Sequence, residues 1–125
     1  MSLSDATPVS FVSVRDRAEG RAFYEDVLGL PHKSGDDFGD FFDMGGGLLR
    51  MTPMPDFQAG PHPVVGWDVT DITATLRSLR DKGVVFTIYD GLGQDADGVW
   101  TAPGGDAKVA WFPDPFGNVL SLSQT

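Results

Sequence analysis

Few side chains in this sequence are suited to catalysis or to metal binding. The chain has no cysteine, which excludes disulfides, thiolate nucleophiles and thiolate metal sites, and only His32 and His62 offer imidazole. His62 lies between two prolines, a setting that favours an exposed loop histidine over one that lines a cavity. His32, just past a predicted helix, is expected at the surface. Any metal site would therefore depend mostly on oxygen ligands.

Two further motifs are better explained by turns than by chemistry. Asp114-Pro-Phe-Gly-Asn118 carries a carboxylate and an amide, but Pro, Gly and Asx residues in this order are typical of a tight turn before a strand. Gly45-Gly-Gly47 lacks the Lys and Ser or Thr that follow in a phosphate-binding loop. No catalytic triad motif and no zinc-protease motif is present. The residues alone therefore indicate no catalytic group.

A few charged and aromatic side chains are candidates for binding a small molecule. Asp68 either faces inward, where it would pair with a cation, or ends a strand and bonds nearby backbone. Arg50 either points inward to hold a carboxylate or phosphonate, or extends to solvent. Phe11 shares a strand face with Val9, and Trp100 lies in a glycine-rich loop, so both are expected to contact a ligand. Other aromatics fit either a cavity or the core: Phe38, Phe41, Tyr89 and Trp111.

The elements that must position these residues occur twice. Residues 8–15 alternate as a strand, Asp16 and Glu19 mark a helix start, and Gly29 ends that helix. Three short strands are predicted next, at residues 30–34, 38–44 and 47–52.

The same pattern returns after residue 62. It predicts a strand at 63–70, a helix from Asp71 to Gly83, and strands at 85–89, 107–112 and 118–123, with a long loop from Asp90 to Asp106. The duplication predicts an α+β fold, in one domain over residues 1–125, built from two βαβββ modules at 8–52 and 63–124. Each half exposes one sheet face unless it packs against another, so a cleft between two facing sheets is expected.

Charge and composition restrict the partners. The 125 residues carry 18 acidic and 9 basic side chains, a net charge of −9, so a phosphate backbone would be repelled at long range. No apolar run is long enough to span a bilayer, and the first residues do not resemble a signal peptide. We expect a cytoplasmic protein that binds neither nucleic acid nor membrane.

Three segments of the sequence are similar to one known family. They are Val14-Arg-Asp16 with 22–30 (AFYEDVLGL), Val69-Thr-Asp71 with 79–84 (LRDKGV), and 112–120 (FPDPFGNVL). The chain resembles the vicinal oxygen chelate superfamily, which includes glyoxalase I, extradiol dioxygenases, fosfomycin-resistance enzymes and bleomycin-resistance proteins. The resemblance implies paired βαβββ modules that form an incomplete, U-shaped barrel around a cleft, and it suggests a homodimer.

The resemblance also implies four positions for metal ligands. In catalytic members, His or Glu side chains on the first and fourth strands of each module hold a divalent metal. The matching positions here are Val9 and Arg50 in module one and Val64 and Ser121 in module two. A shift of one residue in strand register brings no carboxylate or imidazole to any of them. The usual metal site is therefore predicted to be lost, and no cofactor is expected.

Three functions remain open. The first is a metal-free protein that binds a small organic ligand, aromatic or cationic, through a site that includes Val9, Phe11, Arg50, Val64, Asp68, Trp100 and Ser121. The second is a lyase, isomerase or dioxygenase-type enzyme, which would use unusual metal ligands (Asp43, His62, Asp68) or an acid–base group without cofactor (Asp68 or Tyr89). The third is a regulatory or assembly subunit without turnover.

Overall fold

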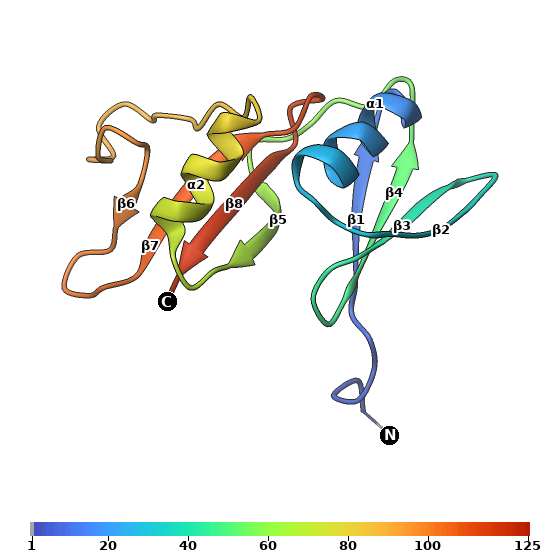
Figure 1. Cartoon of the computed structure of the whole chain (residues 1–125), viewed down its shortest axis with the longest axis horizontal. Helices are drawn as coiled ribbons and strands as arrows, with labels where there is room; N and C mark the ends of the chain where they lie inside the picture. Colours follow the sequence, from blue (N-terminus) through green and yellow to red (C-terminus); the bar gives the residue numbers. More distant parts are fainter. Residues whose placement is uncertain (1) are drawn as a thin grey trace. The chain divides into compact units, whose positions relative to one another are not determined.

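The computed structural model describes residues 2–125, which divide at Gln58/Ala59 into two compact units. In the first unit a strand, a helix and three further strands follow one another: β1 (Val9–Val14), α1 (Arg17–Arg21), which continues into the π-helical segment η1 (Ala22–Val27), then β2 (His32–Asp36), β3 (Gly39–Asp43) and β4 (Leu48–Pro53). The sheet order is β1-β4-β3-β2 (Figure 1), and only the β1–β4 pair is parallel.

The second unit repeats this plan. Its elements are β5 (Pro63–Asp68), α2 (Ile72–Asp81), β6 (Trp100–Thr101), β7 (Lys108–Pro113) and β8 (Val119–Gln124), in the sheet order β5-β8-β7-β6. Again the outer β5–β8 pair is parallel and the others are antiparallel. The predicted α+β fold of two βαβββ modules is confirmed. The cleft between the modules stays a prediction.

Both helices begin and end where the sequence predicts. The carboxylate of Asp16 accepts a hydrogen bond from the Glu19 amide at 2.8 Å, and that of Asp71 accepts one from the Ala74 amide at 3.0 Å. These bonds satisfy amides at helix starts that have no partner within the helix. Gly29 and Gly83 follow the two helices with φ of 77° and 95°, a conformation that glycine adopts at little cost.

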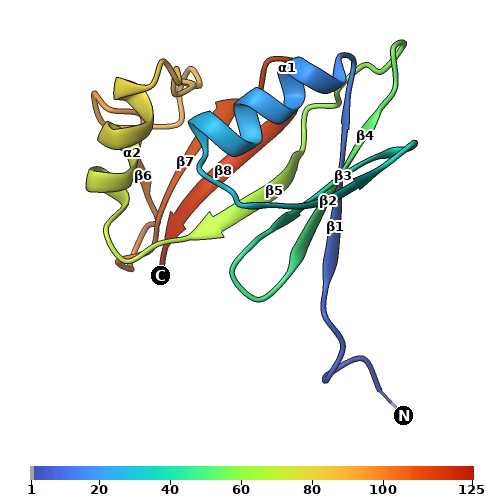
Figure 2. The same ribbon diagram turned by 45° about the vertical axis from the view of Figure 1, so that its right-hand side comes forward.

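In each module the helix covers one face of its own sheet (Figures 1 and 2). In module one, Gly20 lets the helix approach closely, because a Cβ there would lie 2.9 Å from the Met51 sulfur. The side chains beneath the helix are fully or nearly buried: Val12, Val14, Phe42, Leu49 and Met51. The opposite face of this sheet carries Phe11, Phe41 and Arg50.

Module two has the same division. The buried side chains beneath α2 are apolar and come from the helix and three strands: Val65, Ile72, Leu76, Leu79, Ala110, Phe112, Leu120 and Leu122. Because side chains alternate along a strand, Trp111 and Ser121 must lie on the opposite face. This second, open face of the sheet is the one that α2 does not cover.

One predicted strand is wrong. Residues 85–89 do not form a strand, and the position of the second strand of the module is taken by the two-residue β6. Only the Thr87 amide reaches β7, through a 2.8 Å bond to the Trp111 carbonyl. The Gln94 side chain bonds the neighbouring backbone groups. It accepts a hydrogen bond from the Tyr89 amide at 2.7 Å and donates to the carbonyls of Thr87 and Gly98. A side-chain amide thus replaces the backbone pairing that the sequence pattern predicts.

Candidate functional site: an aromatic pocket in module two

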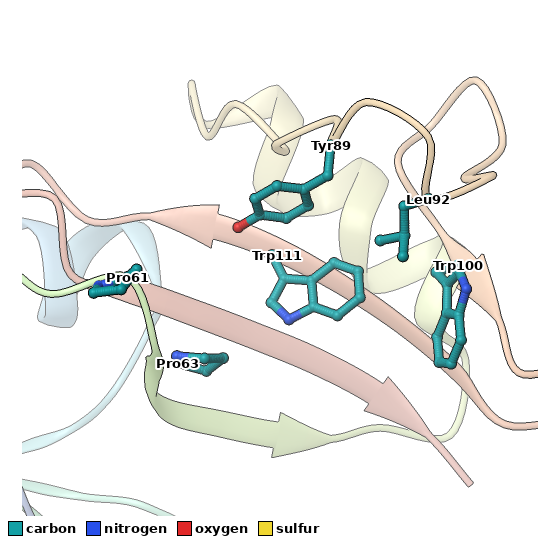
Figure 3. A pocket seen from close by; sticks show the side chains of 6 residues that line it. All are labelled: Pro61, Pro63, Tyr89, Leu92, Trp100 and Trp111. Carbon is teal, nitrogen blue, oxygen red and sulfur yellow. The ribbon is translucent and has the colours of Figure 1, made fainter.

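The open face of module two bears an apolar pocket of about 340 Å³ (Figure 3). In Figure 3, Pro61 and Pro63 lie at one end, Trp100 and Leu92 at the other, and Trp111 between them, with Tyr89 beside Trp111. No charged side chain is among these six lining residues. A small, mostly apolar concavity of this kind is typical of sites for small organic molecules.

Two strands and one loop position the three rings of this pocket. Trp111 lies in the middle of β7, between the buried residues Ala110 and Phe112, so its ring must emerge on the open face. Trp100 belongs to β6, opposite Val109 of β7. Tyr89 is held through its amide by Gln94. The ring positions therefore depend on backbone pairing and on one side-chain amide.

The rings stand at steep angles to one another. The centroids of Tyr89 and Trp111 are 5.7 Å apart with planes at 81°, and those of Trp100 and Trp111 are 6.5 Å apart with planes at 44°. Both pairs lie within the range of favourable aromatic contacts, so each ring helps to hold its neighbour in place. The pocket is preorganised.

Of the residues predicted to contact a ligand, only Trp100 lines this pocket. Ser121 is paired with Trp111 on the neighbouring strand and its hydroxyl lies against Gly66, where a Cβ would collide with it. Val64 sits at a bulge in the pairing of β5 with β8 and is half exposed. From the sequence, Trp111 and Tyr89 could lie either in a cavity or in the core. Leu92 and the two prolines carry no sequence signal for a pocket.

Asp68 lies at the end of β5 and is exposed. Its carboxylate accepts hydrogen bonds from the Ser123 hydroxyl at 2.9 Å and from the Thr125 hydroxyl at 3.1 Å. Asp68 therefore lies at a strand end, as one of the two predicted alternatives has it, although its hydrogen-bond partners are side-chain hydroxyls and not backbone groups.

The predicted residues of module one come together on its own open face. Phe11 is 70% exposed and pairs across the parallel strands with Arg50, while Val9 lies two residues before it on β1. The Arg50 side chain is only 12% exposed, donates to the Asp36 carboxylate at 2.9 Å and lies 4.6 Å from the centre of the Phe41 ring. The hydrogen bond from Arg50 holds the pKa of Asp36 below its ordinary value. Arg50 is thus fixed on the sheet and does not extend to solvent.

The family's metal does not fit these positions. A divalent cation needs several oxygen or imidazole donors, whereas the four matching positions supply two valines, one hydroxyl and the guanidinium of Arg50. That guanidinium forms an ion pair with Asp36 and lies over the Phe41 ring, and its positive charge would repel a metal ion. Within residues 2–125, no group of three or more His, Asp or Glu side chains is placed to hold an ion.

A buried charge cluster joins α1 to the sheet of module one. Asp40, 2% exposed, receives hydrogen bonds from Arg17 at 2.9 Å and from His32 Nε2 at 2.8 Å. Burial raises the pKa of Asp40, but the hydrogen bonds from Arg17 and His32 outweigh it, so the pKa lies below the ordinary value. The prediction that His32 is a surface residue is wrong, because its ring is half buried against Phe42.

Of the donors considered for an enzyme, Asp43 belongs to module one, and His62, Asp68 and Tyr89 belong to module two. His62 is exposed in the loop before β5, and Asp43 is exposed at the end of β3. The Asp68 carboxylate accepts hydrogen bonds from two hydroxyls. Only Tyr89 belongs to the pocket.

A family model matches nearly the whole chain. The model of the Glyoxalase/Bleomycin resistance protein/Dioxygenase superfamily covers residues 8–122, from the first strand of module one to the last strand of module two. The chain belongs to this superfamily. All three motif segments of this superfamily member lie within the matched range.

Solved structures with the same fold cover the superfamily member end to end. A glyoxalase family protein from Bacillus anthracis is 17% identical, with a TM-score of 0.76 over 100% of this chain and 98% of that one. A superfamily protein from Sphaerobacter thermophilus is 18% identical, with a TM-score of 0.74 over 99% and 100%. A lactoylglutathione lyase from Agrobacterium tumefaciens is 15% identical, with a TM-score of 0.72 over 96% and 93%. At these identities the likeness shows the fold alone.

Two other comparisons give negative results. The search among curated proteins finds no significant match. Among the described residues, neither helix has the length and apolar character needed to cross a membrane.

Proposed function

We propose that this superfamily member is a metal-free protein that binds a small organic molecule, aromatic or cationic, in the cytoplasm. The aromatic pocket of module two is the observation that carries the proposal. Its three rings, two prolines and one leucine offer apolar contact area in a concave shape. Preorganised rings lose little conformational freedom on binding, which favours affinity.

The metal positions support binding over metal-dependent catalysis. Arg50 and Ser121 stand where the family pattern has metal ligands on the fourth strands, and Arg50 is held by Asp36 and Phe41, although its buried Nη1 has no hydrogen-bond partner within residues 2–125. The pocket itself contains one titratable group, the phenol of Tyr89, and no second acid or base beside it.

Native mass spectrometry tests this proposal on the protein as purified and after incubation with a library of aromatic and cationic compounds. We expect one compound per chain to remain bound. A variant with Trp111→Ala should lose the adduct, while Trp67→Phe, which changes a tryptophan outside the lining, should keep it. Conversion of the bound compound to a product by the wild-type protein would instead support the enzyme alternative, and an adduct that survives in Trp111→Ala would contradict the site.

We also propose that the protein is a homodimer. Each sheet ends in edge strands, β1 and β2 in one module and β5 and β6 in the other, and open edges are commonly protected by a symmetric copy. Light scattering at tens of micromolar is expected to give twice the chain mass of 13.4 kDa. A mass of one chain would contradict this proposal.

A further inference from the structure

The ring angles in the aromatic pocket favour a round group over a flat one. To stack a planar ligand on both of its faces, two rings must be parallel, but Trp111 meets Tyr89 at 81° and Trp100 at 44°. Three rings that border the pocket from different directions can each turn a face toward a compact group. A volume of about 340 Å³ also lies at the small end for ligand sites, so it suits one head group more than a large molecule.

The chemistry of the walls selects among compact groups. The faces of Trp and Tyr rings carry negative partial charge, and they attract a cation whose own surface is apolar. The pocket lining offers no carboxylate that would favour a primary ammonium through an ion pair. A quaternary methylammonium, which has no N–H group that must be paired, matches this lining best.

The charges of module two are placed to attract such a cation. Residues 59–125 carry eight carboxylates and four basic side chains. Four of these carboxylates lie in the loop 90–106, which has no Lys or Arg, and the other four are balanced by the four basic residues. One of the loop carboxylates, Asp97, is paired with Arg80 at 3.1 Å, so the negative charge that the loop adds near Leu92 and Trp100 comes from the other three. Asp90 directly follows Tyr89.

From these observations we infer that the pocket formed by Tyr89, Trp100 and Trp111 recognises a quaternary methylammonium group. This inference rests on the proposed function and names the chemical class of its ligand. The ring faces hold the cation by cation–π attraction, and the carboxylates of loop 90–106 raise its local concentration.

The test compares choline with 3,3-dimethyl-1-butanol, its neutral isostere, in which carbon replaces the nitrogen. Both are titrated into the full-length protein while the tryptophan fluorescence or the indole NMR signals are followed. Choline is expected to bind about tenfold more tightly than the isostere, since cation–π attraction is absent for the neutral compound. Equal affinity for the two, or tighter binding of the isostere, would overturn the inference.

Three variants locate the effect. Trp111→Leu keeps an apolar wall, so it should abolish most of the preference for choline while binding of the isostere changes less than twofold. Asp90→Asn should weaken choline about twofold at low salt and leave the isostere unchanged. Trp67→Phe, outside the pocket, should alter neither and controls for the optical signal. A choline preference that persists in Trp111→Leu would overturn the assignment to this pocket.

The outcomes separate this inference from the proposed function. If indole or another flat neutral compound binds in the pocket and choline does not, the methylammonium inference is wrong while small-molecule binding stands. If no organic compound perturbs Trp100 or Trp111, both are wrong.

Discussion

Replacing Asp114 with alanine is expected to lower the free energy of unfolding by about 3 kcal/mol or more, since three hydrogen bonds to a buried charge are lost at once. The carboxylate is 4% exposed and accepts from the Phe116 amide at 2.8 Å, the Asn118 amide at 2.9 Å and the Asn118 side chain at 2.7 Å. Alanine would leave these donors buried without that acceptor, in the turn that leads into β8.

Urea unfolding, followed by circular dichroism, measures this effect. Asp114→Asn should be less harmful than alanine, because its carbonyl oxygen can still accept. Asp106→Ala, which removes an exposed carboxylate of the same module, should change the free energy of unfolding by less than about 0.5 kcal/mol. A loss below about 1 kcal/mol for Asp114→Ala would show that the turn does not depend on its carboxylate.

The second large effect concerns Asp40. Asp40→Ala is expected to cost about 1.5 to 3 kcal/mol, because the buried carboxylate bonds both Arg17 and His32. The effect should depend on pH in a defined direction. Since folding lowers the pKa of Asp40, its stabilisation is complete well above the ordinary pKa of about 3.9, and it is lost as the pH falls through the lower pKa of the folded state.

Denaturant unfolding between pH 6 and pH 2 checks this sign. The wild-type protein should lose more stability on acidification than Asp40→Ala, so the two curves should converge at low pH. Asp43→Ala, an exposed neighbour on the same strand, serves as the control. Curves that stay parallel from pH 6 to pH 2 would show that Asp40 does not carry the stabilisation assigned to it.

The parts of the fold that depend on local signals could be predicted from the sequence. Asp16 and Asp71 cap helices, and Asp114 bonds its own turn, because each side chain reaches backbone amides within four residues. The helix cap occurs once in each module, so it marks the start of each helix in the repeat. The departure from the family's metal positions was predicted from the resemblance, and it needs residue types and not geometry.

The parts that depend on register over longer distances could not be predicted. The strand pattern at residues 85–89 gives no sign that Gln94 competes for the same backbone groups. His32 meets Asp40 only because a hairpin folds residues eight apart onto one another. From the sequence alone, Trp111 could lie in the core or line a pocket. A shift of one residue in the register of β7 would move every side chain to the opposite face of the sheet. The sequence therefore predicted an aromatic site that includes Trp100, but it did not predict the other residues that line the pocket.

The central claim is that the aromatic pocket of module two binds a small organic molecule. The three tryptophans of the chain make the most direct test, because two line the pocket and Trp67 does not. In an NMR titration with choline and with indole, followed through the indole N–H signals, at least one compound should shift Trp100 and Trp111 in a saturable way and leave Trp67 in place. If both compounds leave Trp100 and Trp111 unchanged up to concentrations on the order of 10 mM, where even weak ligands with millimolar Kd are mostly bound, the claim is contradicted.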